Sequence, residues 1–367
     1  MALLFMDGFE QYASSAELAY SRYYATSAMP ARWGYVSGTG HYVDNAGYKT
    51  SQPGGVTSKS YNNRMSAGTS YGFAALYLPA TTTLIVGFAY QVSILGSPIY
   101  LRFGGANTSN WSASNSFLTF QFGASGQVTL YNNRTGITLI STPASTVLAN
   151  NWYYIELKIV FGATGSAELK IDGLSVGTAT SVDTRHHTSD SAFNQLGFGA
   201  VNVPPATVQQ YFDDLYVCDG TGATHNDFLG PVSVYTLFPS ANGTTNQFTP
   251  TGVASNWDAV NEQAADTVTY VSSSTANHVD KYNVTDLPVS PTTIHAVAVG
   301  SMGSKSETNA RQFRNTVTVG GTTSNGATAT PAFSIYNMSQ DLFLTAPGGS
   351  AWTASDVNSM EIGVECL

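Results

Sequence analysis

The residues most suited to chemistry are four carboxylates, Asp7, Glu10, Asp213 and Asp214. Two lie near the N-terminus and two interrupt the apolar stretch YFDDLYV about 200 residues later. Clustered carboxylates repel one another unless a cation or hydrogen-bond donors intervene, and Ca²⁺ accepts several oxygen ligands in a flexible geometry. If the two segments pair, one interpretation is a structural calcium site. The other, favoured by the two-residue period of strands, is that the carboxylates point to opposite faces and that some accept backbone N–H bonds from turns.

Hydrolysis of a glycosidic bond needs two carboxyl groups, roughly 5 to 5.5 Å apart in retaining enzymes and further apart in inverting ones. The nearest candidates are Glu156, and Glu168 with Asp172. Glu156 alternates with Ile155 and Leu157, which predicts the solvated face of a strand. Asp172 is explained by a tight turn. We therefore expect no catalytic carboxylate pair.

Nucleophilic and metal chemistry lack their usual patterns. No G-x-S-x-G motif marks a nucleophilic serine. The histidines show neither His-Glu-x-x-His spacing nor a neighbouring cysteine cluster; they are His41, His186, His187, His225, His278 and His295. His186 and His187 are expected in an exposed polar loop, and a pH-dependent role for this pair is the alternative because histidine titrates near neutrality.

Aromatic residues are the remaining candidates for binding. Trp33, Tyr35 and Tyr42 lie in the Gly- and Ser-rich stretch ARWGYVSGTGHYVDNAGYKTSQPGG. Aromatic faces stack on sugar rings and also anchor protein interfaces. These residues are therefore candidates for glycan or subunit contact, against the alternative that they are half-buried strand residues.

Composition indicates the elements that must position these side chains. The 367 residues include 35 Gly, 21 Tyr and 18 Phe, and only 10% are charged. Glycine permits tight turns, and aromatic side chains suit pleated sheets, so an all-β chain is expected. The net charge of −9 with 14 Lys and Arg argues against nucleic-acid binding. The two cysteines, Cys218 and Cys366, suggest free thiols rather than a disulfide framework.

Alternating apolar and polar residues recur through the first 220 residues. The clearest hairpin joins Trp152–Phe161 to Ala167–Ile171 through GATGS, and Asp172-Gly173 then predicts a type I′ turn into a further strand. The N-terminal segment and Tyr211–Val217 bracket this region, and we expect them to pair as first and last strands.

Length and a break in periodicity predict two domains. We expect a jelly-roll sandwich over residues 1–220, a linker over 221–231 and a smaller β-sandwich over 232–367. The predicted strands of the second domain include Val232–Leu237 and Met360–Val364. Thr353 and Asp356 have capping-box spacing and predict a helical turn. The N-terminus does not have the pattern of a secretory signal, no apolar run is long enough to span a bilayer, and we expect neither membrane insertion nor signal-dependent export.

Several of these segments carry a family likeness. From MALLFMDGFEQY through NNWYYIELKIVF and ELKIDG to FDDLYV, the chain resembles concanavalin A-like, laminin-G-like jelly-roll domains. The start LLFMDGFE, the stretch FDDLYVCDGTGATHNDFLGPVSVYTLFP and the segment VTYVSSSTANHVDKYNVTDLP resemble phage and prophage structural proteins. That likeness covers most of the chain and includes AWTASDVNSMEIGVE. Such relatives are described as tail, tail-fibre or head-decoration proteins.

The resemblance implies a non-enzymatic component of the virion, made in the host cytoplasm. Its partners would be other virion proteins, its own copies in a homo-oligomer with a trimer favoured, and in one version a host-surface polysaccharide. The alternative is a polysaccharide-degrading enzyme of the jelly-roll glucanase type on a phage tail. Hydrolases of this fold usually carry Glu-x-Asp-x-x-Glu on one strand, and this chain lacks that motif.

Overall fold

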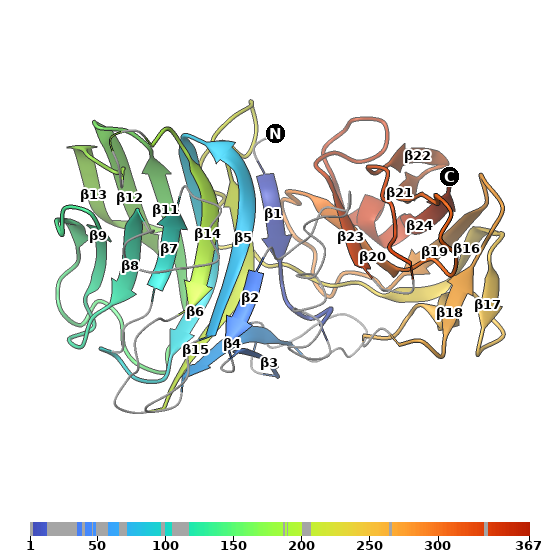
Figure 1. The fold of residues 1–367 in the computed structure, drawn as a ribbon, viewed down its shortest axis with the longest axis horizontal. Coiled ribbons are helices and arrows are strands. Elements are labelled where there is room, and N and C mark those ends of the chain that lie inside the picture. The colour runs from blue at the N-terminus through green and yellow to red at the C-terminus, as the bar shows by residue number, and fades with distance from the viewer. Residues whose placement is uncertain are drawn as a thin grey trace. The chain divides into compact units, whose positions relative to one another are not determined.

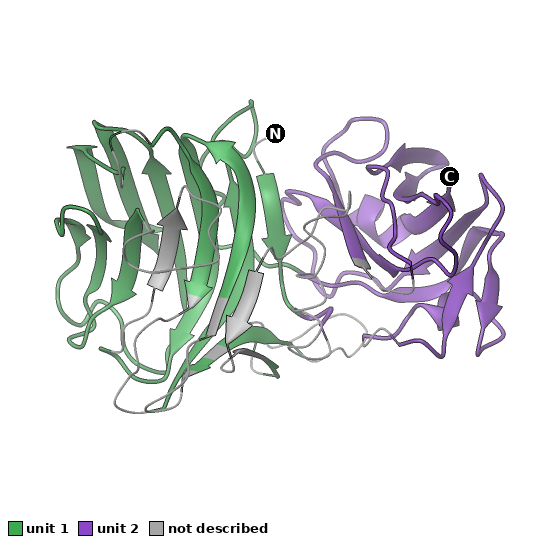
Figure 2. Cartoon of the chain, viewed as in Figure 1, with its two compact units in different colours: residues 1–9, 33–49, 58–234 green, residues 10–32, 50–57, 235–367 purple. Residues whose placement is uncertain are grey.

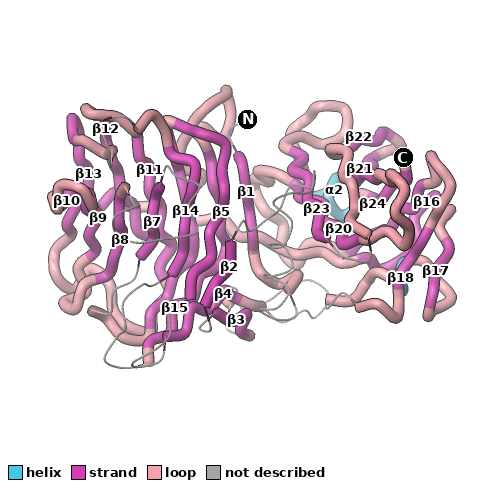
Figure 3. Tube along the Cα trace, viewed as in Figure 1, coloured by secondary structure: helices cyan, strands magenta, loops and turns pink. Residues whose placement is uncertain are grey.

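A computed structural model describes residues 3–12, 35–38, 41–45, 47–48, 58–65, 72–96, 100–104, 117–185, 188, 190–199, 207–263, 266–333 and 337–367. Strands dominate these residues (Figure 3). The chain forms two compact units: residues 1–9, 33–49 and 58–234 make unit 1, and residues 10–32, 50–57 and 235–367 make unit 2 (Figure 2). Residues 221–231, predicted as a linker, therefore belong to unit 1.

Unit 1 contains two antiparallel sheets, which Figure 1 shows as stacked layers. The first has eight strands, with β1 pairing β15 beside the path β13-β12-β11-β6-β15-β4-β3. Their bounds are β1 Leu3–Asp7, β3 His41–Asp44, β4 Ser60–Met65, β6 Thr83–Val92, β11 Tyr153–Val160, β12 Gly165–Ile171, β13 Leu174–Val182 and β15 Val208–Cys218. The expected pairing of the first and last strands is confirmed, because β1 lies antiparallel to β15 with Phe5 opposite Val217.

The second sheet of unit 1 has seven strands in the order β10-β9-β8-β7-β14-β5-β2. Their bounds are β2 Tyr35–Gly38, β5 Gly72–Thr81, β7 Tyr100–Gly104, β8 Leu118–Phe122, β9 Val128–Asn132, β10 Thr138–Ser141 and β14 Phe193–Gly199.

Aromatic rings join the two sheets. Phe88 on β6 packs edge-on against Phe120 on β8 and Phe198 on β14, with ring centroids 6.5 and 6.1 Å apart. Tyr90 stacks on Phe122 at 4.7 Å. All five side chains are buried, and burying large rings is the main favourable term in such a core. The all-β prediction and the jelly-roll sandwich are confirmed.

The predicted hairpins are also confirmed. β11 turns into β12, and Asp172 and Gly173 both have positive φ, 50° and 79°, at the turn into β13. Both central residues of a type I′ turn need that conformation, which the Asp-Gly pair accepts.

Unit 2 is built on a five-stranded antiparallel sheet in the order β16-β19-β24-β21-β22, with two further two-stranded sheets, β17-β18 and β20-β23. The strands are β16 Pro239–Asn246, β17 Thr249–Thr251, β18 Tyr270–Ser272, β19 Val279–Val284, β20 Val297–Gly303, β21 Phe313–Val319, β22 Thr322–Asn325, β23 Asn337–Phe343 and β24 Glu361–Cys366. The helical elements are η3 Trp257–Ala259 and α2 Ala354–Ser359. Within the described residues, no helix is long and apolar enough to cross a membrane.

The core of unit 2 lies between β20, β21, β23 and α2, where Val299, Val317, Phe343, Trp352 and Val357 form one buried cluster. The predicted capping box is confirmed, since Thr353 and Asp356 exchange side-chain and backbone hydrogen bonds. The strand predicted over Val232–Leu237 is wrong: these residues form no strand, and Val234 N donates instead to a carboxylate of unit 1.

Candidate functional site

Residues 221–234, called the strap here, are held to the eight-stranded sheet by two buried carboxylates. Gly230 N donates to Glu156 Oε1 at 2.9 Å, and Val234 N donates to Asp214 Oδ1 at 2.7 Å. Glu156 Oε1 also accepts a 2.6 Å bond from Tyr216 Oη, which itself accepts from Leu229 N at 3.2 Å. The backbone amides of Leu229, Gly230 and Val234 therefore attach the strap to side chains of the sheet.

Charged and aromatic contacts fix the middle of the strap. Lys158 on β11 forms a 3.0 Å ion pair with Asp227, and Lys170 on β12 lies 4.1 Å from the ring centroid of Phe228. Lys158 and Lys170 thus bind two successive strap residues, one through charge and one through a cation–π contact.

Glu156 is fully buried, so its predicted place on a solvated face is corrected. The alternation does place Glu156 opposite Gly87 on the neighbouring strand, but the strap covers that position. A Cβ on Gly87 would lie 2.0 Å from the Tyr216 ring, so glycine leaves the space in which this ring lies. A carboxylate committed to two donors inside the protein holds structure rather than serving as an accessible acid or base.

The two tyrosines beside these carboxylates remain protonated donors. Burial raises the pKa of the Tyr216 hydroxyl far above its ordinary value, and the Glu156 carboxylate raises it further. Burial likewise raises the pKa of Tyr154, with smaller contributions from Tyr216, Asp214 and Glu156. Tyr154 Oη donates to the backbone carbonyl of Asp214 at 3.0 Å.

The acidic set predicted for calcium is wholly buried. Asp7 Oδ1 accepts from Phe9 N at 2.9 Å, and Asp213 accepts from Asp214 N and Tyr48 N, both at 2.7 Å. Phe9 and Asp214 both have positive φ, so the carboxylates stabilise turns and a bulge, as the second interpretation describes. Glu10 belongs to unit 2, where its backbone carbonyl accepts from Gln263.

The calcium interpretation stays a prediction, and the grouping of the side chains does not favour it. Across the described residues, which include all four of these carboxylates, no three Asp, Glu, His or Cys side chains form a group able to hold a metal ion. The carboxylates of Asp7, Asp213 and Asp214 accept backbone N–H groups, and such donors replace the stabilisation that a cation would give.

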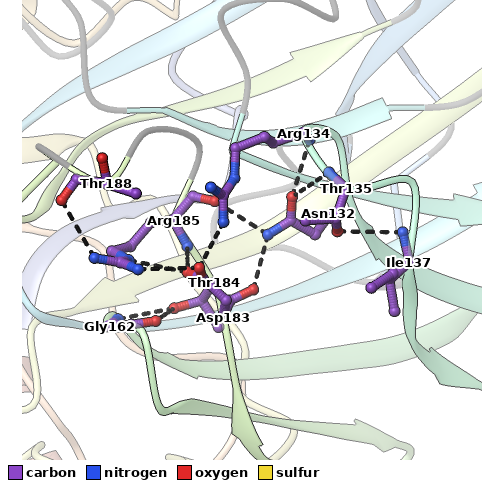
Figure 4. A network of polar contacts seen from close by, with 9 residues as sticks. All are labelled: Asn132, Arg134, Thr135, Ile137, Gly162, Asp183, Thr184, Arg185 and Thr188. Atoms are coloured by element: carbon purple, nitrogen blue, oxygen red, sulfur yellow. Dashed lines mark hydrogen bonds and ion pairs between the residues drawn. The ribbon is translucent and has the colours of Figure 1, made fainter.

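A second polar network joins the sheets at one end of the sandwich (Figure 4). Asn132 on β9 donates to the carbonyls of Asp183 and Arg185, which follow β13, at 2.7 and 3.1 Å. Asp183 bonds Arg185 at 3.0 Å and Arg134 at 2.5 Å. Hydrogen bonds from Arg185 lower the pKa of Asp183 from its ordinary value of 3.8 to about 2.

The aromatic candidates are not gathered on one sheet. Tyr35 lies in β2 of the seven-stranded sheet and Tyr42 in β3 of the eight-stranded sheet. Trp33, like His186 and His187, lies outside the described residues. The role of these three residues in glycan contact stays a prediction.

The seven-stranded sheet differs in charge from its partner. Within its seven strands as bounded above, Arg102 is the one charged residue and there is no carboxylate. In the eight-stranded sheet, β1, β3, β11, β12 and β15 all carry Asp or Glu. The polar side chains in the strands of the seven-stranded sheet are therefore uncharged, apart from Arg102.

Register defines the outer face of this sheet. Thr119 pairs with Tyr131 and Gln121 with Thr129 across β8 and β9, while the alternate residues Phe120 and Phe122 enter the core. On β14, Gln195 is the register partner of Tyr77 and alternates with Phe198 of the core. We call these six residues the neutral face: Tyr77, Thr119, Gln121, Thr129, Tyr131 and Gln195.

Two buried polar groups of the neutral face lack partners. Gln195 and Thr129 are only 2% and 7% exposed, and among the described residues neither Gln195 Nε2 nor Thr129 Oγ1 has a hydrogen-bond partner. An unpaired buried polar group costs about 1–3 kcal/mol and calls for an explanation such as bound water or a ligand. Sequence reasoning missed these residues, although the absence of charge from these strands was a usable signal.

Comparison with known proteins finds distant structural likenesses only. No family model matches the chain, and no curated protein matches it. Among solved structures, it is similar to an endo-β-1,4-glucuronan lyase from the fungus Trichoderma reesei, with 16% identity, 54% of this chain and 95% of that chain covered, and a TM-score of 0.38. It is also similar to the carbohydrate recognition domain of Emp46p, with 10% identity, 51% of this chain and 88% of that chain covered, and a TM-score of 0.35. A third similar structure is the carbohydrate esterase vb_24B_21 of the Shiga toxin-encoding bacteriophage phi24B, with 12% identity, 50% of this chain and 89% of that chain covered, and a TM-score of 0.34.

Replacing Glu156 with alanine should release the strap. The change leaves the buried Tyr216 hydroxyl and Gly230 amide without their acceptor, at a cost of about 1–3 kcal/mol for each unsatisfied group. We expect faster hydrogen exchange at Leu229 and Gly230 and faster proteolysis within 221–234. Glu168→Ala, on the neighbouring strand and half-exposed, is the matched control. Equal protection of the strap in wild type and Glu156→Ala would contradict this role.

Asp183→Asn should weaken unit 1 in a pH-dependent way. A lowered pKa means that the ionised Asp183 contributes stability above about pH 4, and that this contribution is lost as pH falls through about 2. The variant should melt below wild type at pH 7, by up to about 1 kcal/mol in unfolding free energy because the pair is partly exposed. Thermal unfolding followed by circular dichroism should show the difference closing near pH 2, and a difference that persists there would exclude the charge as its cause.

The geometry as a whole establishes the fold. Two antiparallel sheets pack face to face, the first and last strands of unit 1 pair, and the larger unit is a jelly-roll sandwich joined to a smaller β unit.

Proposed function

We propose that this chain is a non-enzymatic structural protein of a phage particle, in the tail, a tail fibre or the capsid decoration, and that its larger unit binds a host-surface polysaccharide through the neutral face. The virion part of the proposal is supported by the resemblance of LLFMDGFE and of the FDDLYV segment to phage and prophage structural proteins. The binding part is supported by the geometry of unit 1.

The observation that carries the binding part is the pair of unpaired polar groups on the neutral face. Both groups are buried when no ligand is bound. Sugar hydroxyls both donate and accept hydrogen bonds, so they would satisfy the amide of Gln195 and the hydroxyl of Thr129 once neighbouring side chains move aside. Tyr77 and Tyr131 lie on the same face, and Tyr77 is 37% exposed. An aromatic ring beside hydrogen-bonding amides and hydroxyls is the combination by which proteins hold sugar rings.

The carboxylates support a role without hydrolysis. Glycosidases need a pair of carboxyl groups on either side of the bond that they cleave. The strands of the neutral face contain none, and the buried Glu156 and Asp214 carboxylates accept the backbone amides of the strap. The competing function, a polysaccharide-degrading enzyme of the glucanase type, lacks its acid and its base on this face.

Purified particles test the virion assignment. Mass spectrometry of particles freed of lysate by density-gradient centrifugation should find this chain at a fixed ratio to the major capsid protein. Labelling with an antibody against unit 2, viewed by electron microscopy, should then locate it on the tail or the head. Its absence from washed particles would reject the assignment, whatever unit 1 binds.

Thr129→Val tests the neutral face without harming the fold. Valine has nearly the shape of threonine and removes a buried hydroxyl that has no partner, so stability should stay unchanged or rise. We expect binding to purified host capsule or lipopolysaccharide, measured by calorimetry, to weaken about tenfold, which corresponds to about 1.4 kcal/mol.

Thr316→Val is the matched control, because Thr316 on β21 of unit 2 is also buried with an unpaired Oγ1 among the described residues. It should leave binding unchanged. Equal binding by wild type and Thr129→Val would reject the neutral face as the site. New reducing ends after incubation with the polysaccharide would reject the non-enzymatic assignment.

A further inference from the structure

The outermost strand of the eight-stranded sheet, β13, pairs on one side only. Its single partner is β12, at the end of the strand path. None of its nine residues is buried, and Leu174 is 72% exposed. An exposed edge of this kind is a template for pairing with another strand.

The edge strand carries none of the usual protection. Natural edges are guarded by charges, especially lysine, and by proline, and LSVGTATSV contains neither. The neighbouring β12 carries Glu168 and Lys170, and the opposite edge of the sheet, β3, carries His41 and Asp44. Of the two edge strands of the eight-stranded sheet, β13 is therefore the one without a charged residue.

The sequence of β13 is close to a palindrome centred on Thr178. Counting outward, Gly177 matches Ala179, Val176 matches Thr180, Ser175 matches Ser181 and Leu174 matches Val182. Each match joins residues of the same kind: small, β-branched, hydroxyl and apolar. When two identical antiparallel strands pair about a two-fold axis, these are the residues that face each other, so the strand is complementary to itself.

The backbone of β13 is ready for such pairing. Register shifts interrupt the β12–β13 ladder near both ends and leave Gly177–Thr180 as its regular central stretch. Bulges at the ends can blunt an edge, and Ser181 has a positive φ of 56°, but Thr178, the centre of the palindrome, lies inside the regular part. A Cβ on Gly177 would lie 2.4 Å from Ile140 on β10, so the strand is held closely against the second sheet and little backbone freedom is lost on pairing.

We propose that two copies of this chain pair antiparallel along β13, with Thr178 on the two-fold axis, to form one continuous sheet across the dimer. The partner is a second copy because a neutral, self-matching strand meets no like charge when it faces itself. The regular stretch Gly177–Thr180 forms the central part of this contact, about 13 Å long. This pair is independent of the glycan proposal, and it differs from the trimer suggested by the sequence.

Cysteine cross-linking tests the register. Directly opposite residues of antiparallel strands have Cα atoms about 4.5–5.5 Å apart, within the range that a disulfide spans. Thr178→Cys should therefore form a covalent dimer under mild oxidation, seen on a non-reducing gel. Native Cys218 and Cys366 are buried, and burial raises the pKa of Cys218 to about 12, so wild type should stay monomeric on the gel.

Thr180→Cys is the matched control. Thr180 is also an exposed threonine of β13, but in the proposed register its two copies lie four residues apart along the strands, about 14 Å. It should not cross-link. Failure of Thr178→Cys to cross-link, or equal cross-linking by both variants, would overturn the proposal.

Solution mass provides the second test. Sedimentation equilibrium of the full wild-type chain should give twice the 38.8 kDa chain mass, and Thr178→Lys, which places two like charges opposite each other, should give the mass of one chain with an unchanged circular dichroism spectrum. A wild-type mass of one or three chains at tens of micromolar, or a dimer retained by Thr178→Lys, would overturn it.

Discussion

The fully buried carboxylate of Glu156, hydrogen-bonded to Tyr216 and to the backbone of Gly230, connects the centre of the eight-stranded sheet to the strap. The chain that follows β15 is held along the sheet by a second bond of this kind, because Asp214 accepts from the amide of Val234, four residues after Gly230. Two carboxylates thus fix where unit 1 ends. A buried anion is costly by itself, and backbone amides offset that cost here as they do at helix N-termini.

The division of charge between the two sheets separates structural from binding chemistry. Most carboxylates and both strap-facing lysines of the eight-stranded sheet, Lys158 and Lys170, contact the strap or stabilise turns. The seven-stranded sheet keeps amides, hydroxyls and rings, with Arg102 as the one charge in its strands. Both sheets share one aromatic core, so the difference lies in their outer faces. A sheet free of carboxylates is suited to holding a hydroxylated ligand and poorly suited to hydrolysing it.

The sequence predicted those parts of the structure that depend on local rules. Alternation and the Asp172-Gly173 turn were enough to place β11, β12 and β13, and the spacing of Thr353 and Asp356 was enough for the cap of α2. Glu156 was misjudged because its burial depends on the strap, a segment without periodicity that lies more than 60 residues away in sequence. Val232–Leu237 was misjudged for the same reason, since its amides bind side chains instead of a neighbouring strand.

Asp213 and Asp214 show where the two-residue period fails. The left-handed φ of Asp214 inserts a bulge between Asp213 and Tyr216, so opposite faces cannot be assigned by counting. The neutral face was missed because its residues come from strands far apart in sequence, and only register brings Gln195 beside Tyr77.

The pairing of β1 with β15 also determines how late in synthesis the eight-stranded sheet can be completed. β15 lies between β6 and β4 and also pairs with β1. It is nevertheless the last strand of unit 1 to be synthesised, about 210 residues after its partner β1. At 5–20 residues per second, β1 waits roughly 10–40 s for that partner. Throughout this interval β6 and β4 expose edges that β15 will later cover. The nascent chain therefore spends most of its synthesis with the middle of its largest sheet missing.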